Sequence, residues 1–329
     1  MKEHQQPLNI LIIGAGAIGC TLAWHLSATD ANVTLLARGA ALRAIEQRGL
    51  TLFKAGQAVS TRAIRTTAHL HTDDGWDVIF MCVKQYDLAK SLESLQHIKC
   101  RTAVIIPLVN GIPWWLLQTH EQLRREPPHT WGKAYANYPQ IHLQRVIGGV
   151  IHIPAQMRDA CTVEQGSRNT LSLGELDGSM SERLHRLTGT IQQSELQCTP
   201  SRNIQQDLWN KLLGNAVFNP ISALANATMH QMLHEPGLHD LCCHVMSEVM
   251  AVGDALGLAQ TTTVEQRMQQ AESAGNARTS MLQDTLAGRR TEGDTLVGVI
   301  VRMARNVGLH TPTLNGVWAM LESRFMRSI

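Results

Sequence analysis

The sequence LNILIIGAGAIGC at residues 8–20 restricts the fold of this chain more than any other stretch. The apolar run 8–13 predicts a buried strand, and Gly14, Gly16 and Gly19 follow it directly, ahead of a predicted helix. In a dinucleotide-binding turn the first glycine permits the tight bend, the second lets the backbone approach a pyrophosphate, and the third lets the helix pack on the strand. A glycine-rich turn without a nucleotide is the alternative. The strand before the turn and the helix after it favour nucleotide binding.

The pattern of apolar residues changes along the chain. Short apolar runs alternate with helical patterns at first, which predicts parallel βαβ units, whereas long amphipathic helices follow residue 203. A chain of 329 residues exceeds the usual size of a single core, so two domains are expected, although one is possible. We predict an α/β, Rossmann-type dinucleotide-binding domain over 1–200 and an all-α C-terminal domain over 201–329. The expected strands are 8–13, 32–37, 77–83, 103–107, 146–153, 170–174 and 195–198, and the expected helices are 17–29, 204–219, 221–233, 236–256 and 292–307.

The second predicted strand decides which nucleotide is expected. It ends in LLARG, which places Arg38 where an NAD site carries an acidic residue for the ribose 2′-hydroxyl. A guanidinium suits a 2′-phosphate, so NADP is predicted over NAD. Arg43 is a possible helper, but we favour a solvated position on the following helix. Lys84 and Asn110 follow two further strands, at the edge of the sheet that borders the cofactor, although Asn110-Gly111 is also an ordinary turn signal.

Composition excludes several classes of protein. The net charge of +2 is spread along the chain without basic or acidic runs, which argues against nucleic acid as a partner. The apolar segment near the start is too short for a membrane span and lacks a cleavage site. Seven cysteines without a CxxC pair predict neither a disulfide framework nor a zinc site, and no metal is expected. These features predict a cytoplasmic protein with a small-molecule substrate, for which a homodimer is possible.

The stretch DLWNKLLGNAVFNP at residues 207–220 predicts an unusual helix. Lys211, Asn215 and Asn219 recur every four residues and therefore share one narrow face, although apolar residues interleave with them. A helical lysine is most often solvated. Pro220 disfavours the α conformation at Asn219, so the helix is expected to break or kink there. We interpret the polar row as lining a cleft, with Lys211 as a proton donor and the two amides positioning a small polar substrate.

A second stretch, RTSMLQDTLAGRRTEGD at residues 278–294, has a purely structural interpretation when only its spacing is considered. Thr291 and Asp294 match a capping box that opens the next helix, and Glu292 would complement the helix dipole. Ser280 is an ordinary N-cap candidate.

Several short segments occur together in a fixed order along nearly the whole chain. They are GAGAIG at 14–19, LLARG at 35–39, CVKQYD at 82–87, NG at 110–111, VIGGV at 146–150, KLLGNAVFNPISAL at 211–224, and SML followed by RRTEGD within 280–294. As an ordered set they resemble the ketopantoate reductase family. The resemblance implies a Rossmann-type N-terminal domain, a helical C-terminal domain like that of 6-phosphogluconate dehydrogenase, and an active site in the cleft between them. It also implies NADPH-dependent reduction of 2-dehydropantoate to pantoate, a step toward coenzyme A.

Carried over position by position, the resemblance implies catalytic roles for Lys211 and Glu292, with the lysine as proton donor. The implied substrate-binding residues are Asn110, Asn215, Asn219 and Ser280, and the implied cofactor-binding residues are Gly14, Gly16, Gly19, Arg38, Lys84, Asn110 and Glu292.

The chain departs from this family in one region. Residues 112–147 form a long stretch where typical members are shorter, and long loops usually carry a function. Trp114 and Trp115 are either core residues or a wall of the substrate cleft, and the second reading leaves the identity of the 2-oxo acid open. One rival is therefore a reductase of another branched 2-oxo acid. Another is an NADPH-binding regulatory protein without turnover, although such a protein would be expected to have lost Lys211 or Glu292.

Overall fold

A computed structural model describes residues 6–71, 73, 75–97, 102–138, 141–258 and 260–325. The chain divides into two compact units. Unit 1 comprises residues 1–109 and 139–204, and unit 2 comprises residues 110–138 and 205–329. The division into domains at 200/201 stays a prediction. In the structure the segment 110–138 packs with the helices of unit 2.

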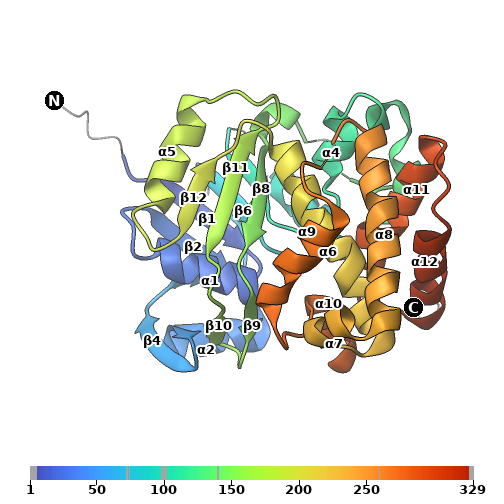
Figure 1. Cartoon of the computed structure of the whole chain (residues 1–329). Coiled ribbons are helices and arrows are strands. Elements are labelled where there is room, and N and C mark those ends of the chain that lie inside the picture. The colour runs from blue at the N-terminus through green and yellow to red at the C-terminus, as the bar shows by residue number, and fades with distance from the viewer. Residues whose placement is uncertain are drawn as a thin grey trace. The chain divides into compact units, whose positions relative to one another are not determined.

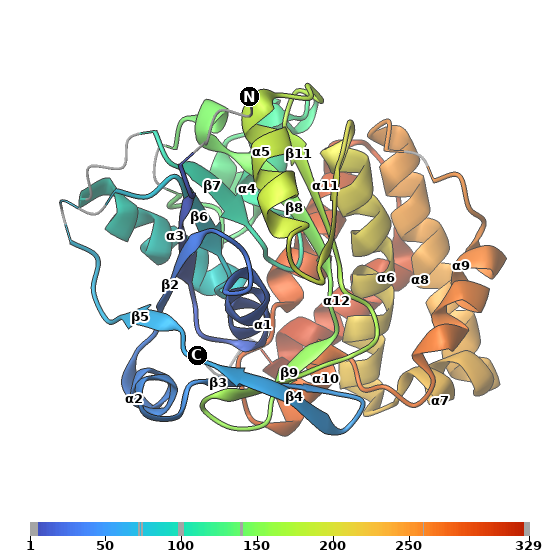
Figure 2. The ribbon, with the colours of Figure 1, turned by 90° about the vertical axis from the view of Figure 1, so that its left-hand side faces the viewer.

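Unit 1 is built on a five-stranded, all-parallel sheet with strand order β5-β2-β1-β6-β7. Helix α1 lies between this sheet and a four-stranded sheet of order β4-β3-β10-β9 (Figure 2). A three-stranded sheet, β12-β11-β8, is covered by α5. The strands are β1 (Asn9–Ile13), β2 (Asn32–Leu36), β3 (Leu50–Lys54), β4 (Gln57–Arg62), β5 (Arg65–Thr67), β6 (Val78–Met81), β7 (Val104–Pro107), β8 (Ile147–His152), β9 (Ala155–Met157), β10 (Thr162–Gln165), β11 (Thr170–Glu175) and β12 (Gln197–Pro200), and the helices are α1 (Ala17–Leu26), α2 (Gly39–Arg48), α3 (Gln85–Ser94) and α5 (Glu182–Ile191), with short 3₁₀ turns at Leu95–His97 and Leu143–Arg145.

Burial explains why the parallel strands read as continuous apolar runs. The residues of β6 and β7 are buried throughout, because helices or other strands cover both faces of the sheet. One apolar cluster joins β1, β6 and β7 to α1 and α5. Strands β3, β4, β5, β9 and β10 were not predicted. The residues of β4 are mostly exposed, so this strand carries no apolar alternation that a sequence pattern could reveal.

Unit 2 is helical (Figure 1). Helix α8 packs against α7, α9, α11 and α12, and the indole of Trp209 on α6 lies against Gly253 of α8. None of the described helices of the chain is long and apolar enough to cross a bilayer. The elements are α4 (Trp114–Thr119), α6 (Ile204–Ala225), α7 (Met229–His234), α8 (Pro236–Ala255), α9 (Val264–Ala271), α10 (Ser280–Leu286), α11 (Val299–Asn306) and α12 (Pro312–Phe325), with 3₁₀ turns η2 (Leu123–Arg125), η3 (Pro128–Trp131) and η5 (Glu272–Ala274) and one π-helical turn, η6 (Asp294–Gly298).

The predicted break at Asn219 does not occur, since α6 continues through Pro220 to Ala225. A proline inside a helix costs about 3 kcal/mol. Phe218 and Ile221 on either side are both buried, and their packing offsets this cost. The helix ends instead beyond Ala225, where Asn226 adopts a left-handed conformation (φ 54°).

Candidate active site

The glycine turn of unit 1 has the geometry that a dinucleotide site requires. Gly14 has φ 111°, and a Cβ there would lie 2.8 Å from the carbonyl oxygen of Cys82. A Cβ on Gly19 would overlap the carbonyl oxygen of Gly14, so only glycine lets α1 pack this closely on the turn. A Cβ on Gly16 would meet nothing within 4 Å, which leaves the outer side of the turn open to a ligand.

The first turn of α1 completes this cradle. Gly16 is the N-cap and has no side chain, and no side-chain cap bonds to the free N–H groups of the helix. Such an N-terminus carries partial positive charge and binds phosphate through its amides. The residues present therefore fit a pyrophosphate at this position.

Two cations follow the neighbouring strands. Arg38 is exposed directly after β2 and is the N-cap residue of α2. Lys84 follows β6 and is the N-cap residue of α3, partly buried. Both lie at the carboxyl edge of the parallel sheet, as predicted. Arg43 is exposed on α2, in agreement with the solvated position favoured for it.

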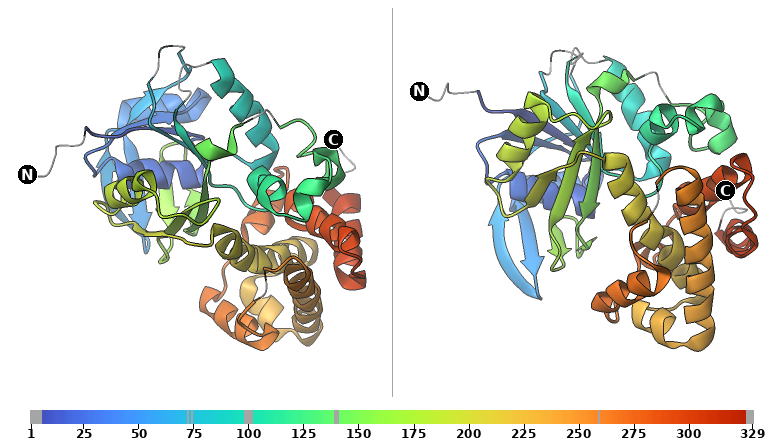
Figure 3. Two further views of the ribbon diagram at one scale, coloured as in Figure 1. Left: turned by 90° about the horizontal axis from the view of Figure 1, so that it is seen from above. Right: turned by 45° about the horizontal axis from the view of Figure 1, so that its top comes forward.

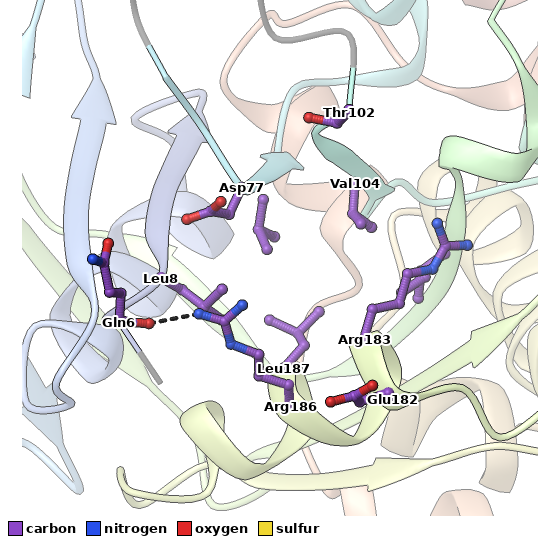
Figure 4. A pocket seen from close by; sticks show the side chains of 11 residues that line it. Gln6, Leu8, Asp77, Thr102, Val104, Glu182, Arg183, Arg186 and Leu187 are labelled. Carbon is purple, nitrogen blue, oxygen red and sulfur yellow. Dashed lines mark hydrogen bonds between the residues drawn. The ribbon is translucent and has the colours of Figure 1, made fainter. Parts of the chain in front are cut away.

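A cavity of about 540 Å³ lies at the opposite, amino edge of the strands (Figure 4). Three of its charged groups have protein partners. Arg183 donates to both carboxylate oxygens of Glu175, Arg186 donates to the main-chain oxygen of Gln6, and Asp77 accepts from a main-chain N–H. This cavity is remote from the glycine turn along the strands and is not the predicted cofactor site.

In unit 2, α6 presents the predicted polar row. Lys211 and Asn215 are partly buried and Asn219 is buried, one helical turn apart from each other. Among the described residues, the side chain of Lys211 makes no hydrogen bond and no ion pair within 4 Å. The row is therefore neither a solvated surface nor a satisfied structural network.

Electrostatics couples Lys211 to Glu292, which is distant in sequence. Burial lowers the pKa of the Lys211 ammonium from 10.5 to about 8, and the charge of Glu292 acts in the opposite direction. Glu292 itself is only 7% exposed. The charge of Glu292 thus reaches Lys211 within unit 2.

The backbone around Glu292 differs from the predicted capping box. Thr291 Oγ1 is buried and makes no hydrogen bond within the described part of the chain, and the carboxylate of Asp294 pairs with Arg302. The helix opens instead with the π turn η6, and the carbonyl of Glu292 accepts from Leu296 N at 3.1 Å. Single π turns are frequent at functional sites.

The remaining predicted substrate residues differ in exposure. Asn110 is partly buried at the start of unit 2. Ser280 is exposed and begins α10, whereas Thr279 is the N-cap residue and accepts from Leu282 N at 3.2 Å. Ser280 as N-cap was therefore wrong.

The segment 110–138 lies beside α11 (Figure 3). Trp114 and Trp115 are both almost fully buried, and Trp114 stacks on Tyr138 with ring centroids 5.5 Å apart. Of the two readings left open for these tryptophans, burial supports core packing. No sequence pattern pointed to Thr295 and Arg302, which connect this segment to the π turn, or to Tyr135, which bonds to Ile112 within the segment.

Both parts of the chain are similar to proteins of one known family. Residues 10–178 match the family model "Ketopantoate reductase PanE/ApbA", and residues 203–324 match "Ketopantoate reductase PanE/ApbA C terminal". The chain belongs to the ketopantoate reductase family. This membership confirms the predicted resemblance, the two-part fold class and the assignment to a family of oxidoreductases.

Individual relatives cover almost all of the chain. The 2-dehydropantoate 2-reductase of Mesorhizobium japonicum is 32% identical over 317 residues, which are 96% of this chain and 97% of the relative. A crystal structure of a protein designated a ketopantoate reductase from Ralstonia solanacearum aligns with a TM-score of 0.86 and 29% identity, covering 97% of this chain and 99% of that chain. D-mandelate dehydrogenase with NADH and anilino(oxo)acetate shares the fold, with a TM-score of 0.79, 20% identity and coverage of 96% and 97%.

Proposed function

We propose that this member of the ketopantoate reductase family uses NADPH to reduce 2-dehydropantoate (ketopantoate) to pantoate. The observation that carries the proposal is the lysine of the polar row, Lys211, whose pKa burial lowers to about 8 while the charge of Glu292 acts to raise it. The Mesorhizobium japonicum relative, named as a 2-dehydropantoate 2-reductase, supports the choice of substrate. The free cysteines described in the structure fit a reducing cytoplasm, the compartment we propose.

Unit 1 would hold the cofactor. The glycine turn and the first amides of α1 would bind the pyrophosphate, Arg38 would pair with the 2′-phosphate, and Lys84 would lie on the cofactor side of the sheet edge. When bound, NADPH supplies the hydride that reduces the keto carbon.

Lys211 is the proton donor in this proposal. Addition of a hydride to the keto carbon develops negative charge on the substrate oxygen, which an ammonium group stabilises and then protonates. A lysine with a pKa of about 8 is still largely protonated at neutral pH, yet releases its proton more readily than an exposed lysine. An asparagine cannot supply this proton, so Asn215 and Asn219 are assigned to orientation rather than proton transfer.

Glu292 and the polar neighbours would orient the substrate. A buried carboxylate accepts hydrogen bonds, which suits a substrate hydroxyl group. The amides of Asn110, Asn215 and Asn219 can both donate and accept, and Ser280 offers a hydroxyl at the surface of unit 2. Fixing the carboxylate and carbonyl of the substrate in this way lowers the entropic part of the barrier.

The reduction of other 2-oxo acids is the second candidate. The same fold is found in D-mandelate dehydrogenase, whose structure was determined with NADH, so the fold alone does not select the acid or the nicotinamide.

One assay separates these possibilities. The absorbance of NADPH, and separately of NADH, is followed with ketopantoate, 2-oxoisovalerate and phenylglyoxylate. The proposal predicts the highest kcat/KM for NADPH with ketopantoate, and a loss of roughly 10²- to 10⁴-fold in kcat for Lys211→Ala. Lys90→Ala, at an exposed lysine of α3, is the matched control and should keep full activity. A higher kcat/KM with another acid would make that acid, and not ketopantoate, the proposed substrate. Absence of turnover with every acid would favour a regulatory NADPH-binding protein.

A further inference from the structure

We propose that Thr295 is a positioning residue that fixes Glu292 relative to the turn at Asn110. The roles of Glu292 and Asn110 rest on the proposed function, whereas the connection between them is a feature of unit 2 alone. Thr295 is 4% exposed and lies in the π turn η6. It contacts both segments at once, one through its side chain and the other through its backbone.

The side chain of Thr295 holds the Glu292 segment. Its hydroxyl donates to the carbonyl oxygen of Glu292 at 3.2 Å, and the main-chain N–H of Leu296 donates to the same oxygen at 3.1 Å. Two donors on one carbonyl restrict the peptide group of Glu292. Because the carboxylate extends from this residue, restricting its backbone also restricts where the carboxylate can lie.

The backbone of Thr295 holds the turn that follows Asn110. Its carbonyl oxygen accepts from Ile112 N at 3.1 Å, and Ile112 is fully buried. Gly111, between Asn110 and Ile112, has φ 84°, and a Cβ there would lie 2.8 Å from the carbonyl carbon of Thr295 and closer still to its oxygen. Only glycine therefore allows this approach and this backbone conformation together.

Two further side chains, those of Tyr135 and Arg302, support the contact between the segment 110–138 and the π turn. Tyr135 Oη donates to the carbonyl of Ile112 at 2.7 Å, and its side chain is buried. Arg302 Nε donates to the carbonyl of Trp131 at 2.8 Å, and its guanidinium pairs with Asp294 at the start of the π turn. The segment 110–138 is thus attached to the start of η6 twice, at Ile112 through Thr295 and at Trp131 through Arg302, and Tyr135 holds Ile112 within the segment.

The first test changes the contact at Gly111. Gly111→Ala forces a Cβ against Thr295, whereas Gly308→Ala introduces a Cβ at a similar φ of 74° with nothing within 4 Å. Both substitutions carry the same left-handed strain, so their difference isolates the contact. Gly111→Ala should accelerate amide hydrogen exchange in residues 291–298 by at least roughly tenfold, and Gly308→Ala should leave that peptide unchanged.

The second test removes only the hydroxyl. Thr295→Val should raise the KM for ketopantoate roughly fivefold, the scale of one hydrogen bond, while the Kd for NADPH stays unchanged. Thr295→Ser keeps the hydroxyl and should retain most of the wild-type KM. The matched control is Thr188→Val in α5, where an equally buried hydroxyl donates to Leu184 O at 3.0 Å and the effect on KM should be absent.

The outcomes separate this inference from the proposed function. If the wild type turns over but Thr295→Val and Thr188→Val give the same KM, the positioning role is wrong. Hydrogen exchange requires no turnover, so unchanged exchange at 291–298 in Gly111→Ala would refute the coupling even if the wild type reduces no 2-oxo acid. If the wild type shows no turnover but hydrogen exchange at 291–298 is accelerated in Gly111→Ala, only the proposed function is contradicted. If Gly111→Ala fails to fold, exchange at 291–298 in Thr295→Val, expected to accelerate, decides the coupling instead.

Discussion

The pH dependence of kcat/KM in Glu292→Gln tests the coupling between the two central residues. In the wild type, burial lowers the pKa of Lys211 to about 8, and the charge of Glu292 keeps it from falling further. Because reduction requires the protonated lysine, kcat/KM should be constant at low pH and fall as pH rises through about 8. At pH 7 roughly 90% of the lysine is protonated, and at pH 9 roughly 10%.

Replacing the carboxylate with an amide removes the charge that raises this pKa. A nearby opposite charge is worth about one to three pKa units, so the alkaline limb of Glu292→Gln should move down by at least about one unit. Between about pH 6 and about pH 9 the variant should therefore lose roughly tenfold more kcat/KM than the wild type, in addition to any loss that is independent of pH. The pH at which kcat/KM begins to fall, and not the absolute value of kcat/KM, therefore decides the test.

The measurement is the initial rate of NADPH oxidation at low substrate, which gives the pKa of the free enzyme. Lys211→Arg is a useful control, since a guanidinium does not lose its proton in this range and any residual activity should show no alkaline limb. An alkaline limb in Glu292→Gln at the wild-type position, or above it, would refute the reasoning.

Three further predictions concern single features of the two units. Arg38→Ala should lower the ratio of kcat/KM for NADPH over NADH at least roughly tenfold, because the guanidinium is expected to pair with the 2′-phosphate, and steady-state kinetics with both cofactors measures this. Glu248→Ala should lower the free energy of unfolding by about 1–2 kcal/mol in urea denaturation, since this carboxylate accepts from two N–H groups at the start of α12, at 3.0 and 2.7 Å. His25 is buried, bonds to Gln165 at 2.7 Å, and has its pKa lowered from 6.5 by burial. The unfolded chain binds this proton more readily, so stability present above about pH 6.5 is lost as pH falls through the lower folded pKa, and His25→Gln should show a smaller slope of unfolding free energy against pH. An unchanged cofactor ratio, an unchanged unfolding free energy or an unchanged slope would contradict these three predictions in turn.

The parts of the fold that follow from local pattern were predictable. The apolar run before Gly14 gave β1, and the 3.6-residue period gave α8 almost to its last residue. Helix α6 was recognised, but its end was not, because the packing of Phe218 and Ile221 outweighs the local preference around Pro220.

Features that depend on distant contacts could not be predicted in the same way. The association of 110–138 with unit 2 depends on Arg302, which is 171 residues beyond its partner Trp131, and on Thr295, which accepts from Ile112. The π turn replaced the expected capping box because Asp294 pairs with Arg302 rather than capping the helix. The proximity of Lys211 and Glu292 was expected only from the resemblance to a family, since no periodicity relates the two positions.

Chemical rescue of Lys211→Ala by small primary amines tests the role of this lysine most directly. If Lys211 donates the proton, then methylamine or ethylamine in the assay should restore a measurable part of kcat, and the rescued rate should follow the concentration of the protonated amine. If the variant still binds NADPH and ketopantoate but no amine restores turnover, or if it turns over at the wild-type rate without an amine, Lys211 is not the proton donor.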